Sequence, residues 1–598
     1  MRFSLSRRER AGVRVGSARF VDFCRGVAKA FPRQPMTRIE RTLSRMAIFC
    51  LAAGLLVAGC GKPPTRVSVG VEEQILHMGN KSEPQELDPH IVQGVGEHNI
   101  ISALLENLVS EDPIDLHPVP AIAESWDISP DGTVYTFHLR PGVRWSNGEP
   151  MTALDFIRSY QRAITPKLGN EYAYMFYVMK GAEDFHHGKT KDFSTVGAKA
   201  LDERTLQITL NGPVPYFLSL LNHYSWWPLH IPTVMKHGSL DVRNNRWTRP
   251  KNWVGNGAFV LARWDVGREI VVKKNPLYWD ADKVKLREIH FLPIESLDTE
   301  ERAYRAGQLH LTYEVPLSKI PIYRKEHPDL IRIDPYLGCY FYRVNLKVPH
   351  LQDKRVRHAL SMSIDRRSIV ENITRGGQIP AYNLTPPNTA GYTARAVTKY
   401  DPEAARKLLA EAGHPGGRGL APVEIHYNTS EAHRSIAEAI QQMWKKELGI
   451  DARLLNEEWK VYMDSQTRMN YQVSRSGWIG DYPDPSTFHE TFLSDSGNNR
   501  TGFSNAEYDR MVKEAARLGD QAKRYELFQK AEAILMDEMP ILPIYFYTRV
   551  FLIHPSVRGW NPTILDHHPY KYVWLEAPPA PQQLSAREAG SRGLSSTP

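Results

Sequence analysis

The sequence predicts a mixed α/β (α+β) fold made of several packed lobes. The chain has 598 residues, more than one ordinary hydrophobic core supports. Strand and helix patterns follow one another along it without an internal repeat. An apolar fraction of 42%, with 27 Tyr and 13 Trp, is enough to build a large core. These observations indicate a large globular protein.

The first 59 residues have the pattern of a leader. They carry 12 Lys and Arg against three acidic residues, and the uncharged stretch MAIFCLAAGLLVAG (residues 46–59) follows the last of the arginines. This stretch is too short to span a bilayer. It ends in LVAGC, which resembles a lipobox, so we expect cleavage before Cys60 and a lipid on its sulfur. An ordinary secretory leader is the alternative, and residues 1–35, which precede Met36, are interpreted as an upstream extension.

Charge and cysteine count describe the part that follows this leader. Without residues 1–59 the formal net charge of +8 becomes −1, which argues against a nucleic-acid partner. Cys24 and Cys50 leave with the leader and Cys60 is expected to be acylated. Only Cys339 then remains, so we expect no intramolecular disulfide.

Local patterns place several elements in the mature chain. Residues 60–66 are interpreted as a tether before a first strand, VSVGV. Alternation predicts a strand over residues 134–139, and Thr152 with Asp155 forms the capping box of a following helix.

Further patterns are found in the second half of the chain. The stretch YDPEAARKLLAEAGHP predicts a helix with Asp401 as N-cap and Gly413 as its stop. A strand (VEIHYNTS), a helix (HRSIAEAIQQMWKKEL) and a strand (GIDARLL) follow. Residues 578–598 lack large apolar side chains except two leucines and are expected to be disordered.

Motifs for catalysis, nucleotide binding or metal binding are missing from the sequence. It has no nucleophile elbow, phosphate loop or dinucleotide fingerprint. The neighbouring histidines at 186–187 and 567–568 point apart on a helix or strand, so they are interpreted as surface or loop residues and not as a chelate. Asp484, before a proline, is interpreted as a turn residue. We therefore expect no catalytic residue, no metal and no cofactor.

Eight fragments, in this order, resemble extracellular solute-binding proteins of the oligopeptide/dipeptide ABC transporter class (family 5), and most of all its oligopeptide-binding receptors. They are ELDPH, PAIAESWDISPDGTVYTFHLRPGVRWSNGEPMTALDF, NGPVPYFLSLL, NGAFVL, NPLYWD, DKRVRHALSMSIDR, ARKLLAEAGH and RSGWIGDYPDP. The resemblance covers roughly residues 67–575. It implies a periplasmic-binding-protein-like type II fold with two hinged lobes and an additional third lobe. Its implied ranges are 67–106, 232–312 and 549–577 for lobe I, 107–231 for the accessory lobe II, and 313–548 for lobe III.

The resemblance also implies a peptide site in RSGWIGDYPDP. Asp481 corresponds to an aspartate that pairs with the α-ammonium of a bound peptide, and Arg475 to an arginine that holds the carboxylate of a short peptide. A buried charge needs a partner, and an arginine can hold a carboxylate by two parallel hydrogen bonds. Gly477 leaves room for a peptide backbone that pairs with the strand edge. The alternatives are an Arg475–Asp481 ion pair and a purely structural Trp478.

Other positions correspond to binding residues of the oligopeptide receptors. Tyr172 and Trp459 would shape pockets, and Val95 would offer backbone contacts. His433 would meet the carboxylate of a longer peptide, or it is an ordinary polar residue at a helix start.

At two positions the chain departs from its relatives. Relatives often carry a glutamate where this chain has Gln93, and an arginine where it has Gln466. The first change should weaken any preference for basic side chains, and the second removes one anchor for the carboxylate. Arg468, expected on a strand, is a candidate to compensate.

The sequence thus predicts a non-enzymatic receptor in the periplasm or cell envelope, anchored through Cys60 to a membrane, inner or outer. Its expected partners are short peptides and the ABC permease subunits of the inner membrane, and we expect a monomer. Receptors of the same fold for murein peptide, nickel chelate or haem are alternatives. An exported hydrolase with two acids in one cleft is a further alternative.

Overall fold

The computed structural model of the chain describes residues 63–577. The chain divides into two units after Pro64, and everything below concerns the unit that begins at Thr65. The predicted leader, Cys60 and the predicted tail at 578–598 lie outside the described residues. Within residues 63–577 no helix has the length and apolar character needed to cross a membrane.

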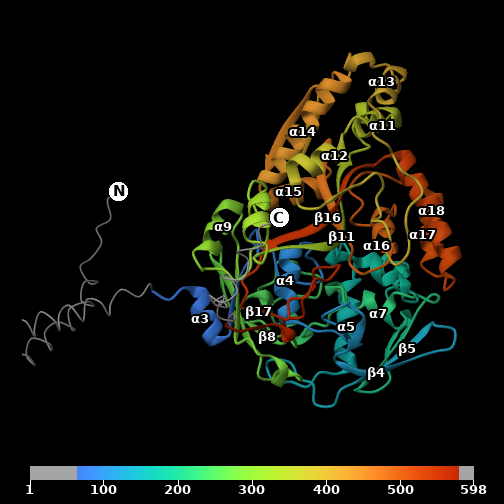
Figure 1. Cartoon of the computed structure of the whole chain (residues 1–598). Coiled ribbons are helices and arrows are strands. Elements are labelled where there is room, and N and C mark those ends of the chain that lie inside the picture. The colour runs from blue at the N-terminus through green and yellow to red at the C-terminus, as the bar shows by residue number, and fades with distance from the viewer. Residues whose placement is uncertain (1–62, 578–598) are drawn as a thin grey trace, which may run out of the picture. The chain divides into compact units, whose positions relative to one another are not determined.

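Three larger sheets organise this unit (Figure 1). The first has the strand order β1-β10-β9-β8, with only β1 and β10 parallel. Its strands are β1 (Ile75–Gly79), β10 (Glu288–Leu292), β9 (Glu269–Lys274) and β8 (Phe259–Asp265). The helices nearest to these strands in sequence are α3 (Arg66–Glu73), α4 (Val95–Leu104), α8 (Ile231–Lys236), α9 (Leu297–Arg305) and α10 (Ile320–Glu326).

The predicted first strand, VSVGV, is wrong, because these residues form the helix α3. The side chain of Thr65 caps this helix by accepting a hydrogen bond from the Ser68 N–H. Val67 and Gly70, three positions apart, are the buried residues of the helix. Burial at helical spacing therefore prevails over the strand preference of the valines. Arg66, assigned to the tether, is the first residue of α3.

The second sheet is antiparallel, with the order β4-β5-β7-β6. Its strands are β4 (Ala123–Ile128), β5 (Val134–Leu139), β7 (Thr205–Thr209) and β6 (Ala198–Ala200), and the helices around it are α5 (Ala153–Ala163), α6 (Ala182–His186) and α7 (Phe217–Leu220). The predicted strand at 134–139 is confirmed with its alternating burial. The predicted capping box is confirmed too: the Thr152 N–H donates to Asp155 Oδ2 at 2.8 Å.

The third sheet has six strands in the order β12-β16-β11-β15-β13-β14. They are β12 (Ile379–Pro380), β16 (Ile541–Leu552), β11 (Ile331–Val344), β15 (Val473–Ile479), β13 (Val423–Asn428) and β14 (Ala452–Glu457). β13 is parallel to both of its neighbours, and the other pairs are antiparallel. The helices of this region are α11 (Lys354–Met362), α12 (Arg366–Ser368), α13 (Pro402–Glu411), α14 (Glu431–Leu448), α15 (Trp459–Thr467), α16 (Ser486–His489), α17 (Ala506–Ala515) and α18 (Gln521–Glu538).

Short elements complete the described chain. Two small sheets pair β2 (Val109–Glu111) with β3 (Pro118–Pro120) and β17 (Val557–Arg558) with β18 (Trp574–Leu575). The 3-10 turns are η1 (Pro166–Leu168), η2 (Ala173–Val178), η3 (Phe193–Thr195), η4 (Tyr224–Trp226), η5 (Arg246–Thr248), η6 (Ala281–Lys283), η7 (Pro349–Leu351), η9 (Pro415–Gly417), η10 (Glu490–Phe492) and η11 (Tyr570–Tyr572). A π-helical turn, η8 (Ile369–Thr374), follows α12.

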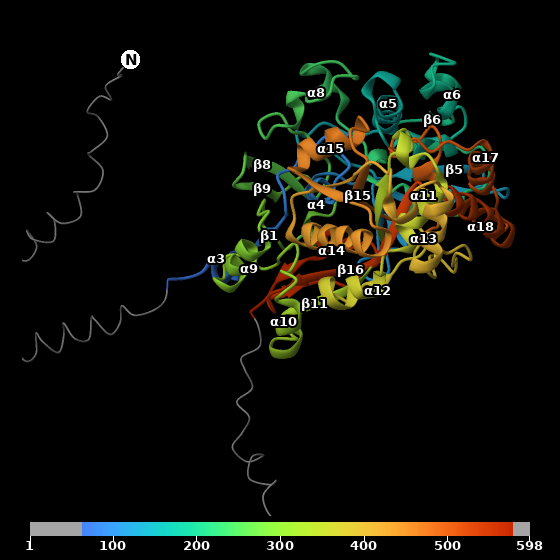
Figure 2. The same cartoon turned by 90° about the horizontal axis from the view of Figure 1, so that it is seen from above.

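The elements predicted in the second half of the chain are confirmed. The Asp401 side chain caps α13 by accepting from the Ala404 N–H, and the predicted strand–helix–strand is β13, α14 and β14. α14 packs against β13 and β14, while α17 and α18 run side by side in both views (Figures 1 and 2).

Strand β11 holds the third sheet together, and the end of its neighbour β16 leads to the first sheet. Residues 338–344 of β11 pair with β15. On the other side of β11, β16 pairs with residues 331–335 and 339–343, with two register shifts. Beyond the end of β16, Ile553 bridges to Leu311, which also bridges to Met78 of β1. The three larger sheets fall into the three lobe ranges, although β16 crosses the 548/549 boundary; the exact boundaries stay a prediction.

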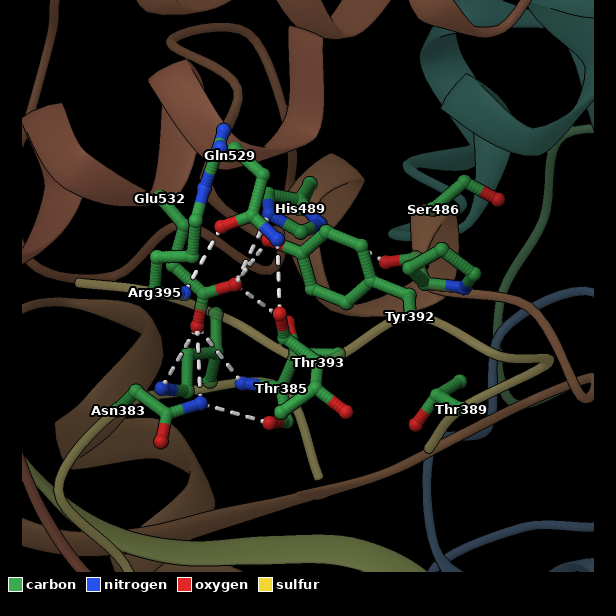
Figure 3. A network of polar contacts seen from close by, with 12 residues as sticks. Asn383, Thr385, Thr389, Tyr392, Thr393, Arg395, Ser486, His489, Gln529 and Glu532 are labelled. Carbon is green, nitrogen blue, oxygen red and sulfur yellow. Dashed lines mark hydrogen bonds and ion pairs between the residues drawn. The ribbon is translucent and has the colours of Figure 1, made fainter. Parts of the chain in front are cut away.

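A buried carboxylate, Glu532 of α18, fixes the loop that follows β12 (Figure 3). Its oxygens accept hydrogen bonds from the backbone N–H groups of Leu384 and Thr385, both at 3.0 Å, and from the Tyr392 hydroxyl at 2.9 Å. The Thr385 hydroxyl and the Asn383 amide add two more. Although burial raises it, the pKa of Glu532 is held below its usual value by His489, whose Nε2 lies 3.4 Å from the carboxylate, and then by the Thr385 and Tyr392 donors.

We predict that Glu532→Gln destabilises the protein by about 2–4 kcal/mol, because an amide N–H₂ would face donors that then lack an acceptor. Urea unfolding followed by circular dichroism measures this loss. The matched control is Glu526→Gln on the same helix, which removes an exposed ion pair with Arg395 and should cost less than about 1 kcal/mol. Equal losses in the two variants would contradict the structural role of Glu532.

Candidate functional site

A cavity of about 350 Å³ lies where segments from distant parts of the chain meet. All ten residues predicted to bind the ligand line it. They are Gln93, Val95, Tyr172, His433, Trp459, Gln466, Arg475, Gly477, Trp478 and Asp481. Their roles in binding stay predictions, but the chain brings them together from β15, α4, α14, α15 and the segments between helices and strands.

Arg475 lies in the middle of β15 and is surrounded by neutral groups. Its guanidinium donates to the Tyr547 hydroxyl at 3.1 Å and to the Asn428 side-chain oxygen at 3.4 Å, and it lies over the Tyr340 ring at 4.8 Å. No carboxylate among residues 63–577 is within 4.0 Å of it, and its Nε is buried without a hydrogen-bond partner. This excludes the alternative of an Arg475–Asp481 ion pair and leaves a half-buried cation without an anion.

Gly477 makes room for one of these arginine partners. A Cβ atom built on it would lie 2.7 Å from the Tyr547 hydroxyl and 3.2 Å from the Cys339 carbonyl oxygen. The missing side chain therefore lets Tyr547 approach β15 and reach Arg475. A ligand backbone was the expected reason for this glycine, but a protein side chain already requires it.

Asp481 follows β15 and is a buried carboxylate with weak partners. The Thr487 hydroxyl donates to Oδ2 at 3.2 Å and accepts from the Asp481 N–H at 3.0 Å. Burial raises the pKa of Asp481 to about 8. His223 Nε2 lies 3.4 Å from Oδ1, but burial lowers the pKa of His223 to about 3, so it is neutral at pH 7 and supplies no cation.

Two predicted aromatic residues form a wall beside Asp481. The rings of Tyr172 and Trp478 are 6.2 Å apart, and the Tyr172 ring lies 4.4 Å from His223. The Trp478 indole donates to the Thr487 hydroxyl at 3.3 Å, and both aromatic residues belong to the main hydrophobic core. Trp478 is therefore a core residue that also borders the cavity.

His433 and Trp459 lie near the starts of two helices. The His433 ring is 3.3 Å from the Tyr340 hydroxyl through Nδ1, and its Nε2 is buried without a partner. Burial, together with the charge of Arg475, lowers the pKa of His433 well below its usual value. His433 is therefore a neutral residue with one ring nitrogen free toward the cavity. Trp459 is half-buried and stacks on Tyr462 at 5.7 Å.

The two departures from relatives have partners inside the protein. The Gln466 amide donates to the Tyr462 hydroxyl at 2.7 Å and to the Arg475 carbonyl at 2.9 Å, so it supports β15. The Gln93 side-chain oxygen accepts from the guanidinium of Arg500. Val95 begins α4, where the first N–H groups of a helix lack intrahelical partners.

The proposal that Arg468 compensates for Gln466 is wrong. Arg468 follows the helix α15 and lies on no strand, and it pairs with Asp464 at 2.9 Å on the surface. It does not line the cavity.

The interpretation of His567 and His568 as surface or loop residues is confirmed for the loop, because both lie between β17 and η11 outside any helix or strand, but it is wrong for the surface. Both side chains are largely buried, and His567 lines the cavity. They do point apart, as expected: His567 binds Glu111 and His568 binds Asp566. Although burial lowers it, the carboxylate of Glu111 raises the pKa of His567.

Other cavity residues escaped the sequence analysis, namely Tyr340, Arg343, Arg500 and Tyr547. Arg343 had a signal, because it is a charge inside the apolar run CYFYRV. Tyr547 and Arg500 come from segments without any motif.

Two groups in the described part of the chain have metal-ligand atoms close together. Glu183, His187 and Asp495 form one, but Lys513 pairs with both carboxylates at 3.1 Å and so takes the place of a cation. The other, at Asp112, Asp115 and His117, consists mostly of exposed loop residues. Neither group touches the cavity.

One edge of β15 is open beside the cavity. β13 pairs with β15 only at Val473 and Ser474, so among the described strands none covers that edge along residues 475–479. An open strand edge presents backbone N–H and C=O groups that can pair with another extended chain.

Comparisons with known proteins agree with this geometry. The family model of bacterial extracellular solute-binding proteins, family 5 Middle, matches residues 117–500. The periplasmic oligopeptide-binding protein OppA of Escherichia coli (strain K12) is 38% identical over 538 residues, which cover 88% of this chain and 97% of that protein.

Two solved structures are also similar. The Escherichia coli murein tripeptide binding protein MppA gives a TM-score of 0.80 at 35% identity, and Haemophilus influenzae OppA in complex with RPPGFSPFR gives 0.78 at 35% identity. Each comparison covers 84% of this chain and 99% of the other.

We predict that Asp481→Asn stabilises the ligand-free protein increasingly as pH rises from about 4 to 8. In this window the folded protein keeps the Asp481 proton while the unfolded chain loses it, so the wild type loses up to about 1.4 kcal/mol of stability per pH unit relative to the variant. Urea unfolding at a series of pH values, after removal of bound ligand by refolding, measures the difference. Asp464→Asn, on the surface, is the control, and a difference that stays constant with pH would contradict a raised pKa.

Proposed function

The chain belongs to the bacterial extracellular solute-binding proteins of family 5, and from this premise we propose that it is the peptide receptor of an ABC importer. It captures short peptides and delivers them to the membrane permease. One observation carries the proposal: the guanidinium of Arg475 and the largely buried carboxyl group of Asp481 border the same cavity, and neither has an oppositely charged partner within 4.0 Å, since His223 beside Asp481 is neutral.

These two charges match the two ends of a free peptide. A peptide α-ammonium at Asp481 would supply the missing cation and lower the pKa of the carboxylate toward its usual value. A peptide carboxylate at Arg475 would meet a guanidinium whose Nε has no partner. The α-ammonium would therefore favour the ionised form of Asp481, and the carboxylate would supply the counterion that Arg475 lacks within the protein.

Between the two charges, the open edge of β15 supports main-chain recognition. Hydrogen bonds to residues 475–479 would hold a peptide backbone without reading its side chains. Arg475 and Asp481 are six positions apart, so their Cα atoms are at most about 20 Å apart. A peptide of two to five residues spans at most about 7–18 Å, which fits between them. Longer peptides would carry their carboxylate toward His433.

Delivery requires the site to open and close. We propose that β11 and β16, which pair across the boundary between lobe ranges, form part of the hinge. Peptide bound to both sides would favour the closed arrangement. The receptor would act as a monomer in the periplasm or cell envelope, tethered through Cys60 to a membrane and docking on the inner-membrane permease, without catalysing a reaction.

A murein peptide is the second candidate ligand. It is favoured by the similarity to the murein tripeptide binding protein MppA, at a TM-score of 0.80. Such a ligand also presents a peptide backbone, so the same cavity can be tested with both classes.

A hydrolase would need two cavity acids with different protonation. Asp481 has a raised pKa, and although burial raises it, the guanidinium of Arg549 lowers the pKa of Asp566. However, Asp566 is committed to Arg549 and His568. We therefore favour the receptor, and peptide cleavage products after incubation would contradict this choice.

We predict that Asp481→Ala weakens binding of a free-amine tripeptide by at least about tenfold and leaves binding of its N-acetylated form nearly unchanged, because only the free amine presents a cation. Isothermal titration calorimetry with Ala-Ala-Ala and acetyl-Ala-Ala-Ala measures both. Asp464→Ala, on the surface, is the matched control. Equal losses for the two peptides would overturn the assignment of Asp481.

Native mass spectrometry of the purified protein gives an independent test. A co-purified peptide mass that disappears in Asp481→Ala supports the proposed function. A bound haem or nickel chelate in its place would overturn it.

A further inference from the structure

A second pair of buried cations borders the cavity, apart from Arg475. Arg343 of β11 and Arg500, in the loop between η10 and α17, are 3% and 4% exposed. Both are cavity-lining residues.

The partners of these two guanidiniums are neutral. Arg343 donates through Nε to the Ser476 hydroxyl at 3.0 Å and through Nη1 to the Asn498 carbonyl at 2.7 Å. Arg500 donates to the side-chain oxygen of Gln93, and its Nε is buried without a partner. Among residues 63–577 no carboxylate lies within 4.0 Å of either guanidinium. An unpaired buried guanidinium is costly, and here two are neighbours.

The surroundings do not compensate for this double charge. Burial, together with the charge of Arg500, lowers the pKa of Arg343 to about 10. Glu171 is the carboxylate whose charge acts on both, but it lies beyond ion-pair distance, and burial raises its own pKa. The phenols of Tyr462 and Tyr471 are the other titratable groups near Arg343, and burial raises the pKa of Tyr471. Two cations thus face one distant acid.

The register of the third sheet separates this pair from Arg475. Arg343 pairs with Ser474 on β15, whereas Arg475 pairs with Tyr342 on β11. Directly opposite residues share a face and successive residues alternate, so Arg343 and Arg475 lie on opposite faces of the sheet. Ser476 is on the face of Arg343, and its hydroxyl accepts a hydrogen bond from Arg343 Nε. A ligand carboxylate that is bound to Arg475 therefore cannot bind Arg343 in the same way.

The residues beside Arg343 and Arg500 leave a surface against which a ligand side chain can pack. Trp478 shares the face of Arg343, and Tyr172 lies against Trp478. An aromatic wall beside a pair of guanidiniums would accept a short aliphatic stem that ends in an anion.

We propose that Arg343 and Arg500 form a pocket for the carboxylate of an acidic side chain, so that the receptor prefers peptides containing Glu or Asp. The inference rests on the proposed peptide-binding function and names its substrate class. The ligand carboxylate would join the free Nε of Arg500 to Arg343, while Gln93 holds Arg500 from a segment 407 residues away in the chain.

Calorimetry with matched tripeptides tests the pocket. The probes are Glu-Ala-Ala, Ala-Glu-Ala and Ala-Ala-Glu, each compared with its Gln and Lys counterparts. At one position we expect Glu to bind at least tenfold more tightly than Gln, and Lys more weakly than Gln. Affinities within threefold of one another at all positions, or a preference for Lys, would overturn the inference.

Variants assign the preference to these residues. Because Arg500 lies in a loop, Arg500→Gln should fold, and it should reduce the Glu-to-Gln affinity ratio to less than threefold. We expect the same reduction in folded Arg343→Gln. Arg468→Gln, on the surface, should keep the ratio of the wild type. An unchanged ratio in Arg500→Gln would contradict the pocket.

The same experiment separates the two levels of the proposal. If none of the tripeptides binds, the proposed function itself is contradicted. If all of them bind in a manner that depends on Asp481 but without preference for Glu, only the acidic pocket is overturned.

Discussion

The antiparallel register of β11 against β15 is the constraint on which the site depends. Seven pairs, from Gly338 opposite Ile479 to Val344 opposite Val473, decide which side chains share a face. A shift by one residue would move Arg475 to the face of Arg343 and bring Ser474 into its place. The same strand pairs with β16, which carries Tyr547 to Arg475. The positions of both guanidinium groups thus follow from one strand pairing.

The site also contains polar and charged groups whose burial without partners lowers the stability of the folded protein. A carboxyl group with a raised pKa, three guanidiniums without carboxylate partners and a histidine nitrogen without a partner all border one cavity. Outside the cavity, buried charges are satisfied to different degrees. Asp484, interpreted as a structural turn residue, pairs with Arg524 at 2.7 Å, and Glu532 accepts five hydrogen bonds, whereas Glu86 has an oxygen without a partner and burial raises the pKa of Glu300 to about 8. The gathering of several such groups at one cavity supports the proposed role in ligand binding.

Sequence patterns predicted what depends on local chemistry. The alternation of β5, the capping box of α5 and the cap of α13 are all local, and they were correct. The segment after Thr65 was predicted as a strand because valines favour strands, but its burial at helical spacing was not recognised. The predicted site residues were chosen because they correspond to binding positions of the family. They lie at one cavity because the chain shares the family's fold. The positions of Tyr547 and Arg500 could not be predicted from local patterns. The neighbours of Tyr547 are set by the register of the strands, and those of Arg500 lie hundreds of residues away in the chain.

Proteins usually protect an unpaired strand edge, since it can recruit strands of other molecules and start aggregation. Here the free edge of β15, over residues 475–479, faces a cavity instead of open solvent. A strand that is part of another folded domain is too bulky to enter a space of about 350 Å³, whereas a short, single extended chain can. Enclosure therefore acts as a size filter that makes an otherwise adhesive edge safe in a crowded compartment.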